Sequence, residues 1–136
     1  MYELTFTLEP HPGEGFVRIR AQGRLTAPDM LEMLEKLTTE HPGLNRLWDF
    51  RQVDLTSWTL DDMRMYIDVL VRRAPGSPIV RVAGLVSRDI DFELARMFEE
   101  LAAGTLPVVG AVFREDAEAI RWVSTRPDTL GPPAAD

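Results

Sequence analysis

The fold is decided by residues 79–123, which read IVRVAGLVSRDIDFELARMFEELAAGTLPVVGAVFREDAEAIRWV. Residues 79–86 are almost continuously apolar, as is typical of a strand buried on both faces. Apolar residues at helical spacing follow, and a second apolar run occupies 106–113. Residues 115–123 then return to the helical pattern. Strands that alternate with helices in this way predict a parallel sheet with right-handed crossovers.

The N-terminal residues predict a hairpin and a helix. Residues 2–9 and 16–21 alternate polar and apolar side chains, and the turn sequence His-Pro-Gly-Glu-Gly at 11–15 joins them. We therefore expect two antiparallel strands. The sequence Thr-Ala-Pro-Asp at 26–29 is typical of a helix N-terminus, and the apolar spacing after it predicts a helix to about Thr39.

The middle of the chain predicts a third strand over 44–50, an irregular polar segment over 51–58 and a helix that ends before Pro75. The following helix begins at Asp89 or Asp91 and is closed by Gly104. The side chains expected to face the core are Leu60, Met63, Ile67, Leu70 and Val71 in the first of these helices, Phe92, Ala95, Phe98 and Ala102 in the next, and Ala119, Ile120 and Trp122 in the last.

These elements give the order ββαβαβαβα in one α/β domain over residues 1–123. We expect a five-stranded, mostly parallel sheet with one antiparallel strand and with helices packed on it. Residues 124–136 lose the apolar periodicity and gain prolines, so we expect a flexible C-terminal tail.

Composition excludes several classes of function. A net charge of −7 opposes binding to nucleic acid, and no basic run offsets it. The chain has no cysteine, which removes disulfides, thiolate catalysis and most structural zinc sites. No basic segment followed by an apolar one precedes the first strand, and no apolar run is long enough to span a membrane. We therefore expect a cytoplasmic protein.

Four short stretches together resemble the SpoIIAA-like family of the STAS superfamily, over about residues 2–123. They are Gly-Arg-Leu-Thr at 23–26, Leu-Trp-Asp-Phe at 47–50, Arg-Val-Ala-Gly-Leu-Val at 81–86 and Val-Phe-Arg-Glu-Asp-Ala-Glu-Ala-Ile-Arg-Trp-Val at 112–123. The resemblance implies a fold more than an activity, because one fold hosts many functions.

The resemblance carries two functional expectations. Anti-sigma-factor antagonists of the superfamily have a phosphorylatable serine in an Asp-Ser-Ser-Gly type of motif after the third strand. Residues 54–59 of this chain, Asp-Leu-Thr-Ser-Trp-Thr, keep hydroxyl groups but have neither the serine pair nor the glycine. The fold is also likened to Sec14-type lipid-binding domains, which implies an apolar ligand between a helix and the sheet.

Ligands of open α/β sheets bind beyond the carboxyl ends of the strands, so the polar residues at those ends are the candidates for a site. Asp49 and Arg51 either orient a polar ligand or pair with each other, and Trp58 is either a core residue or an interface anchor. Ser57 and Thr56 are either phosphorylated or ordinary turn hydroxyls. The candidate ligand- or partner-binding residues are Asp49, Arg51, Asp54, Ser57, Trp58 and Ser87; the candidate phosphorylation sites are Ser57 and Thr56.

No enzymatic constellation is visible in the sequence. His11 and His41 both belong to His-Pro-Gly turns and lack metal-ligand spacing, so we expect no catalytic residue, no metal and no cofactor. The first hypothesis is a non-enzymatic regulatory or protein-interaction module, and the alternative is a small carrier of an apolar or lipid-like ligand. An apolar pocket discriminates them, and Met30, Met33, Met63 and Met65 are candidates to line it. Homo-oligomerisation is compatible with either hypothesis.

Overall fold

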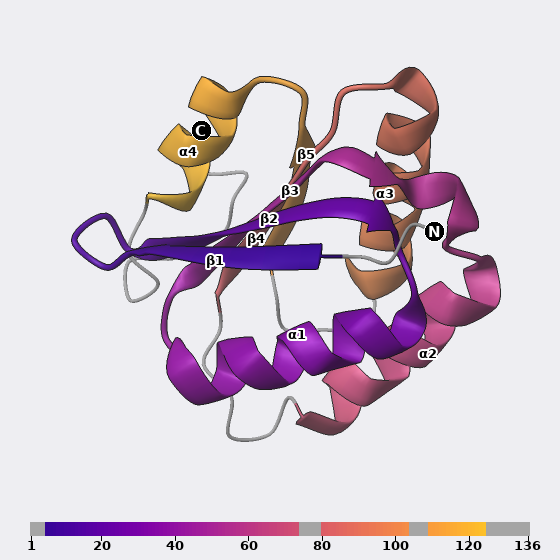
Figure 1. Ribbon diagram of the computed structural model, residues 1–136, viewed down its shortest axis with the longest axis horizontal. Helices are drawn as coiled ribbons and strands as arrows, with labels where there is room; N and C mark the ends of the chain where they lie inside the picture. Colours follow the sequence, from indigo (N-terminus) through magenta and orange to yellow (C-terminus); the bar gives the residue numbers. More distant parts are fainter. Residues whose placement is uncertain (1–4, 74–79, 104–108, 125–136) are drawn as a thin grey trace.

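The computed structural model describes residues 5–73, 80–103 and 109–124 (Figure 1). Its elements follow the predicted order ββαβαβαβα, with a short 3-10 helix after the third strand. In chain order they are β1 (Thr5–His11), β2 (Phe16–Arg24), α1 (Ala27–Glu40), β3 (Asn45–Asp54), η1 (Leu55–Ser57), α2 (Leu60–Arg73), β4 (Arg81–Leu85), α3 (Asp89–Ala103), β5 (Val109–Phe113) and α4 (Asp116–Val123).

The five strands form one mixed sheet in the order β1-β2-β3-β4-β5. Strand β1 pairs with β2 in antiparallel register, and all other neighbours are parallel. The carboxyl ends of β2, β3, β4 and β5 therefore lie along one edge of the sheet. The expected single α/β domain with one antiparallel strand is confirmed.

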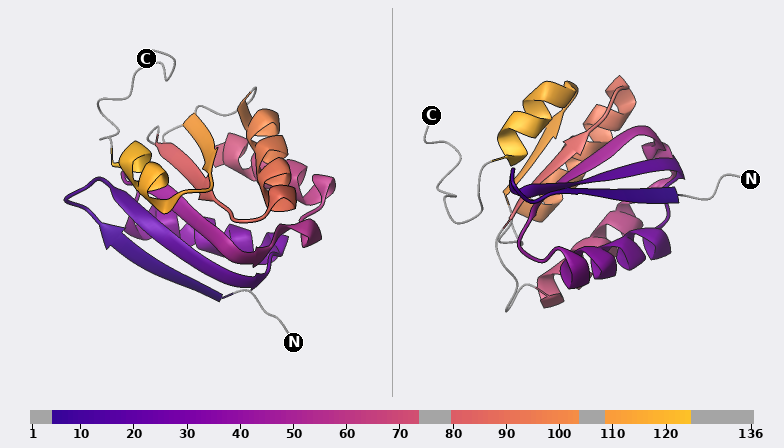
Figure 2. Two further views of the ribbon diagram at one scale, coloured as in Figure 1. Left: turned by 90° about the horizontal axis from the view of Figure 1, so that it is seen from above. Right: turned by 60° about the vertical axis from the view of Figure 1, so that its left-hand side comes forward.

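Helices cover the two faces of the sheet unequally (Figure 2). The larger core joins α1 and α2 to the face of the sheet that carries Val17, Ile19 and Trp48, and α3 packs against its border. On the other face, α4 covers a smaller core around Leu47 and Leu85. Because side chains alternate along a strand, each of the central strands contributes to both cores.

The third strand is longer than predicted. It runs to Asp54, and the segment 51–58, expected to be irregular, contains the end of β3 and all of η1. Backbone pairing with β2 continues from Gln22 opposite Gln52 to Arg24 opposite Asp54. The side chains of 51–54 are mostly polar, which is typical of a loop, so the sequence did not indicate a strand here. The end of β3 is held in the sheet by its backbone pairing with β2.

The burial of α2 and α3 also differs from the prediction. In α2, Met63, Tyr66 and Ile67 are buried, whereas Leu60 and Val71 are 42% and 38% exposed. Leu70 is half-buried and packs against the core, so α2 contacts the core from Met63 to Leu70. In α3, Ala102 is buried, but Phe92, Ala95 and Phe98 are only half-buried.

Strand β4 was expected to be buried on both faces, and one of them is not closely packed. Ala83 and Leu85 are buried beneath α4, but Val82 and Gly84 on the opposite face are half-buried. In α4, Ala119 is buried as predicted, and Ile120 and Trp122 are half-buried. Of the half-buried residues of β4 and α3, Val82, Gly84, Ala95 and Phe98 line the cavity described below. Some predictions lie outside the described residues. They are the start of the fourth strand at Ile79, the end of the following helix at Gly104, the start of the fifth strand and the tail after Ser124.

Candidate functional site

The strand ends bring the sequence-predicted segments together. The Ser87 hydroxyl donates a hydrogen bond to the Arg51 carbonyl at 3.4 Å, and the Arg88 guanidinium lies 3.3 Å from an Asp54 carboxylate oxygen. The Ser57 hydroxyl lies 3.1 Å from the Leu25 carbonyl oxygen, to which it donates. These contacts join the ends of β2, β3 and β4 into one polar edge.

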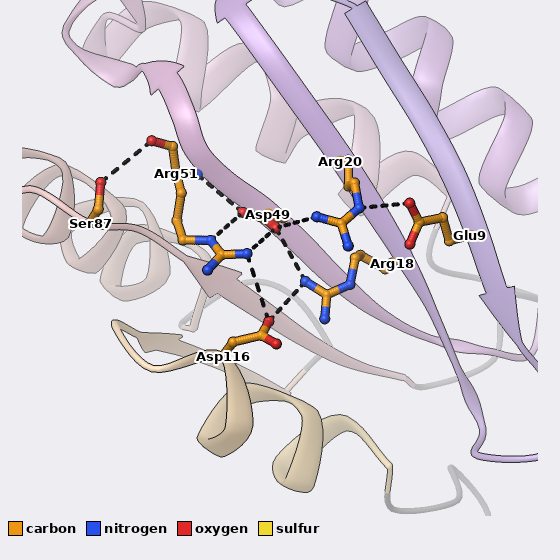
Figure 3. A network of polar contacts seen from close by, with 7 residues as sticks. All are labelled: Glu9, Arg18, Arg20, Asp49, Arg51, Ser87 and Asp116. Carbon is orange, nitrogen blue, oxygen red and sulfur yellow. Dashed lines mark hydrogen bonds and ion pairs between the residues drawn. The ribbon is translucent and has the colours of Figure 1, made fainter.

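Asp49 is the centre of an ion-pair network on the face of the sheet that α4 covers (Figure 3). Its carboxylate accepts two hydrogen bonds from the Arg51 guanidinium, at 2.8 and 2.9 Å, and a third from Arg18 at 3.2 Å. Arg20 lies 3.4 Å from the same carboxylate and also binds Glu9 at 2.6 Å. Asp116 of α4 completes the network by pairing with Arg18 at 2.9 Å.

Every charged group of this network pairs with another group of the same network. Burial alone would raise the pKa of Asp49, but the hydrogen bonds from Arg51 and the charges of Arg51 and Arg18 outweigh this effect and lower it. The three guanidinium groups are balanced by the three carboxylates of Asp49, Asp116 and Glu9. No charge is left over for a ligand within this group of side chains.

Asp54 caps the N-terminus of η1, which contains Thr56 and ends at Ser57. The Asp54 carboxylate accepts hydrogen bonds from the backbone N–H and the hydroxyl of Thr56, and these bonds lower the pKa of Asp54. Together with Gln52 and the end of β2, these residues line an open surface depression. Two of the predicted phosphorylation candidates therefore lie side by side at this depression.

Trp58 lies apart from the polar edge, inside the core. Its side chain is buried, and its ring packs edge-on against Tyr66 at 5.7 Å and against Phe98 at 6.3 Å between centroids. Tyr66 and Phe98 also touch each other, at 6.1 Å. This aromatic triad joins η1 to α2 and α3, and it forms one wall of a cavity.

The cavity has a volume of about 190 Å³ and lies between α2, α3 and the face of β3, β4 and β5. Its lining is almost entirely apolar, and it includes the five aromatic residues Trp48, Phe50, Trp58, Tyr66 and Phe98. Of the methionines considered from the sequence, Met30 and Met63 line it, Met33 is buried in the core and Met65 is 43% exposed. The space is partly open to solvent, and an apolar hollow with few polar groups is typical of a small-molecule site.

The glycine at position 84 opens the space, and a second glycine in the neighbouring strand, Gly110, also lines it. A Cβ atom added to Gly84 in β4 would meet no atom within 4 Å, so this position opens directly into the cavity. Gly110 in β5 lies opposite Val82, and a Cβ there would lie 3.5 Å from the Cγ of Glu99 in α3. Glycine inside a strand often marks the close approach of a ligand or of another chain segment. These two glycines were therefore a signal in the sequence that could have indicated this site.

Two charged side chains, Arg46 and Glu99, interrupt the apolar lining. Burial lowers the pKa of Arg46 and raises that of Glu99, since both charged forms lose hydration there. Tyr66 of α2 also lines the cavity. Its side chain is fully buried, and burial raises its pKa to about 12. Sequence reasoning missed Arg46, although it alternates with Trp48 and Phe50 on the apolar face of β3.

Replacing Glu99 with glutamine tests its burial through the pH dependence of stability. The raised pKa means that, as pH rises above about 4.5, the unfolded chain loses this proton before the folded chain does, so Glu99 reduces stability at neutral pH. We expect Glu99→Gln to raise the melting temperature at pH 7 and to leave it unchanged at pH 3.5. Exposed Glu100→Gln is the control; equal shifts in both variants would contradict the assignment.

The sheet order, the single antiparallel strand and the unequal helix layers define a SpoIIAA-like fold. A solved structure of this fold, from an uncharacterised protein of the DUF3478 family of Shewanella loihica PV-4, superposes with a TM-score of 0.59. The two chains are 17% identical, and the alignment covers 90% of this chain and 95% of that one. No protein-family model and no curated protein matches the chain. The likeness therefore establishes the fold alone.

Two further features bear on the classes of function considered from the sequence. None of the helices in residues 5–73, 80–103 and 109–124 has the length and apolar character needed to cross a membrane. Within the same ranges, no group of three or more His, Asp or Glu side chains is arranged to hold a metal ion.

Proposed function

We propose that this protein is a non-enzymatic binding protein that carries a small apolar molecule in the cavity between its sheet and helices α2 and α3. The observation that supports this most strongly is the cavity itself, an apolar space of about 190 Å³ formed by the glycine at position 84. Apolar cavities of about 150 Å³ bind benzene, so the expected ligand has the size of benzene or somewhat more.

The energetic cost of the space supports the same conclusion. Side chains that line an unfilled apolar space lack the packing contacts that an occupied space would give them. A ligand in the cavity supplies those contacts and stabilises the folded chain that holds it.

The absence of an enzymatic role is part of the proposal. Catalysis requires a nucleophile or an acid–base pair within hydrogen-bond reach of a substrate. Among the described lining residues, Arg46, Tyr66 and Glu99 are the ionisable groups, and the ionised forms of Tyr66 and Glu99 are disfavoured by burial. The lining is suited to holding a molecule.

A regulatory or protein-interaction role, placed first in the sequence analysis, becomes the second candidate. Its support is the polar edge with Thr56 and Ser57, together with Ile90 and Met97 on α3, which are 49% and 43% exposed. A carrier that also presents a surface to a partner protein is consistent with both observations.

Titration with indole, a neutral aromatic molecule of suitable size, tests the carrier function. In two-dimensional ¹H–¹⁵N spectra we expect saturable shifts at the side-chain N–H of Trp58 and at the backbone of Val112, both in the lining. The β1–β2 turn near Gly13, on another part of the molecule, serves as the internal control. Shifts that stay linear to the solubility limit of indole, or that affect the turn equally, would contradict the proposal.

A further inference from the structure

Arg46 belongs to the mostly apolar lining of the cavity, and it forms no ion pair with the residues that the structure describes. It lies on β3 on the same face as Trp48 and Phe50, opposite Val82 of β4. Among the described residues that line the cavity it is the single cation. The alternation of the strand would place an apolar side chain at this position.

No carboxylate in the described residues pairs with Arg46. Its Nε is fully buried and has no hydrogen-bond partner, whereas Arg18, Arg20 and Arg51 on the opposite face all bind carboxylates. The internal stretches outside the described ranges, 74–79 and 104–108, contain neither Asp nor Glu. Arg46 as a whole is half-buried, and burial disfavours its charged form, so a carboxylate beside it would be stabilising.

Glu99, the other charged group in the lining, does not neutralise Arg46. Apart from burial, the charges that act on Glu99 are those of Arg96 and Glu100. Arg46 and Tyr66 both line the cavity, and no carboxylate of the described residues forms an ion pair with Arg46. The cavity therefore offers the Arg46 guanidinium as a donor to a ligand.

We propose that the natural ligand is a small amphipathic anion: an aromatic or aliphatic body with one carboxylate, whose charged group pairs with Arg46 while the body fills the space beside Gly84. The inference rests on the proposed carrier function and specifies its ligand class. A guanidinium matches the geometry of a carboxylate and can bind it through two parallel hydrogen bonds. A dianion such as a phosphate ester fits less well, since one cation would leave half of its charge buried and unpaired.

Benzoate and benzamide provide the test, because they have the same shape and differ in charge. By isothermal titration calorimetry at pH 7 we expect benzoate to bind the wild-type protein at least tenfold more tightly than benzamide. Arg46→Met, which keeps an apolar side chain of similar length, should lose this preference and still bind indole. Arg64→Met is the matched control, since Arg64 is exposed on α2 and its removal changes the net charge equally; it should keep the preference.

The outcomes separate this inference from the carrier function. Equal binding of benzoate and benzamide by the wild-type protein, or a preference for benzoate that survives in Arg46→Met, overturns the inference while indole binding still supports the carrier. Failure of indole, benzamide and benzoate alike overturns both. If Arg46→Met no longer binds indole, Arg46→Gln takes its place, with the same expected loss.

Discussion

Gly84→Leu is expected to fill the cavity, weaken indole binding by at least about tenfold and raise the free energy of unfolding by about 1–2 kcal/mol. The Cβ of the new residue meets no atom within 4 Å, so the side chain enters open space between Trp48 and Val112 on the neighbouring strands. Burial of a leucine side chain there adds apolar contacts that the wild-type protein lacks. Urea unfolding and calorimetric titration with indole measure the two effects.

The matched control is Gly43→Leu, at a position that is also open but lies in the turn before β3. This variant should bind indole as the wild-type protein does. A Gly84→Leu protein that is less stable than the wild type would contradict the geometry of the cavity. Unchanged indole affinity in Gly84→Leu would show that the ligand binds elsewhere.

Asp49→Asn is expected to lower the free energy of unfolding by about 3 kcal/mol, the lower end of the range for removing one partner of a buried ion pair. Asp49 is 6% and Arg18 5% exposed, so the variant leaves buried positive charge beside Arg51 and Arg20. Arg18 keeps its contact with Asp116, which limits the loss. The measurement is urea unfolding at pH 7.

Asp68→Asn is the control for this effect. Asp68 pairs with Arg72 on the exposed side of α2, and surface pairs of this kind contribute at most about 1 kcal/mol. The pH dependence gives a second readout: the lowered pKa of Asp49 means that its stabilising contribution is present above its ordinary value of 3.8 and is lost as pH falls through the lower folded-state value. The account would be contradicted if Asp49→Asn and Asp68→Asn lost the same small amount.

Much of the fold could be predicted because its signals are local. The apolar run before Ser87, the turn at 11–15 and the capping sequence at 26–29 each fix one element, and their order then fixes a largely parallel sheet. The C-terminal part of β3 could not be predicted in this way. Its pairing with β2 places Gln52 opposite Gln22, and both residues have polar side chains like those of a loop.

The site was only partly accessible from the sequence. Strand ends converge on one edge in any parallel sheet, so the grouping of Asp54, Ser57 and Ser87 could be anticipated. Whether Asp49 binds a ligand or its neighbours depends on distances across three elements, and the sequence left that question open. The cavity results from the missing side chain at Gly84, which a glycine within a strand indicates only in general terms. The importance of Arg46 follows from the absence of a paired carboxylate among the described residues, which depends on how the chain folds.

The central claim, that the chain carries a small molecule in this cavity, is tested most directly by native mass spectrometry of the protein purified from the cells that produce it. The account predicts a non-covalent mass on the wild-type chain that disappears on denaturation and is absent from Gly84→Leu prepared in the same way. A wild-type chain that carries no added mass, or one that carries instead a second polypeptide or a covalent phosphoryl group, would contradict the carrier function and favour the interaction module.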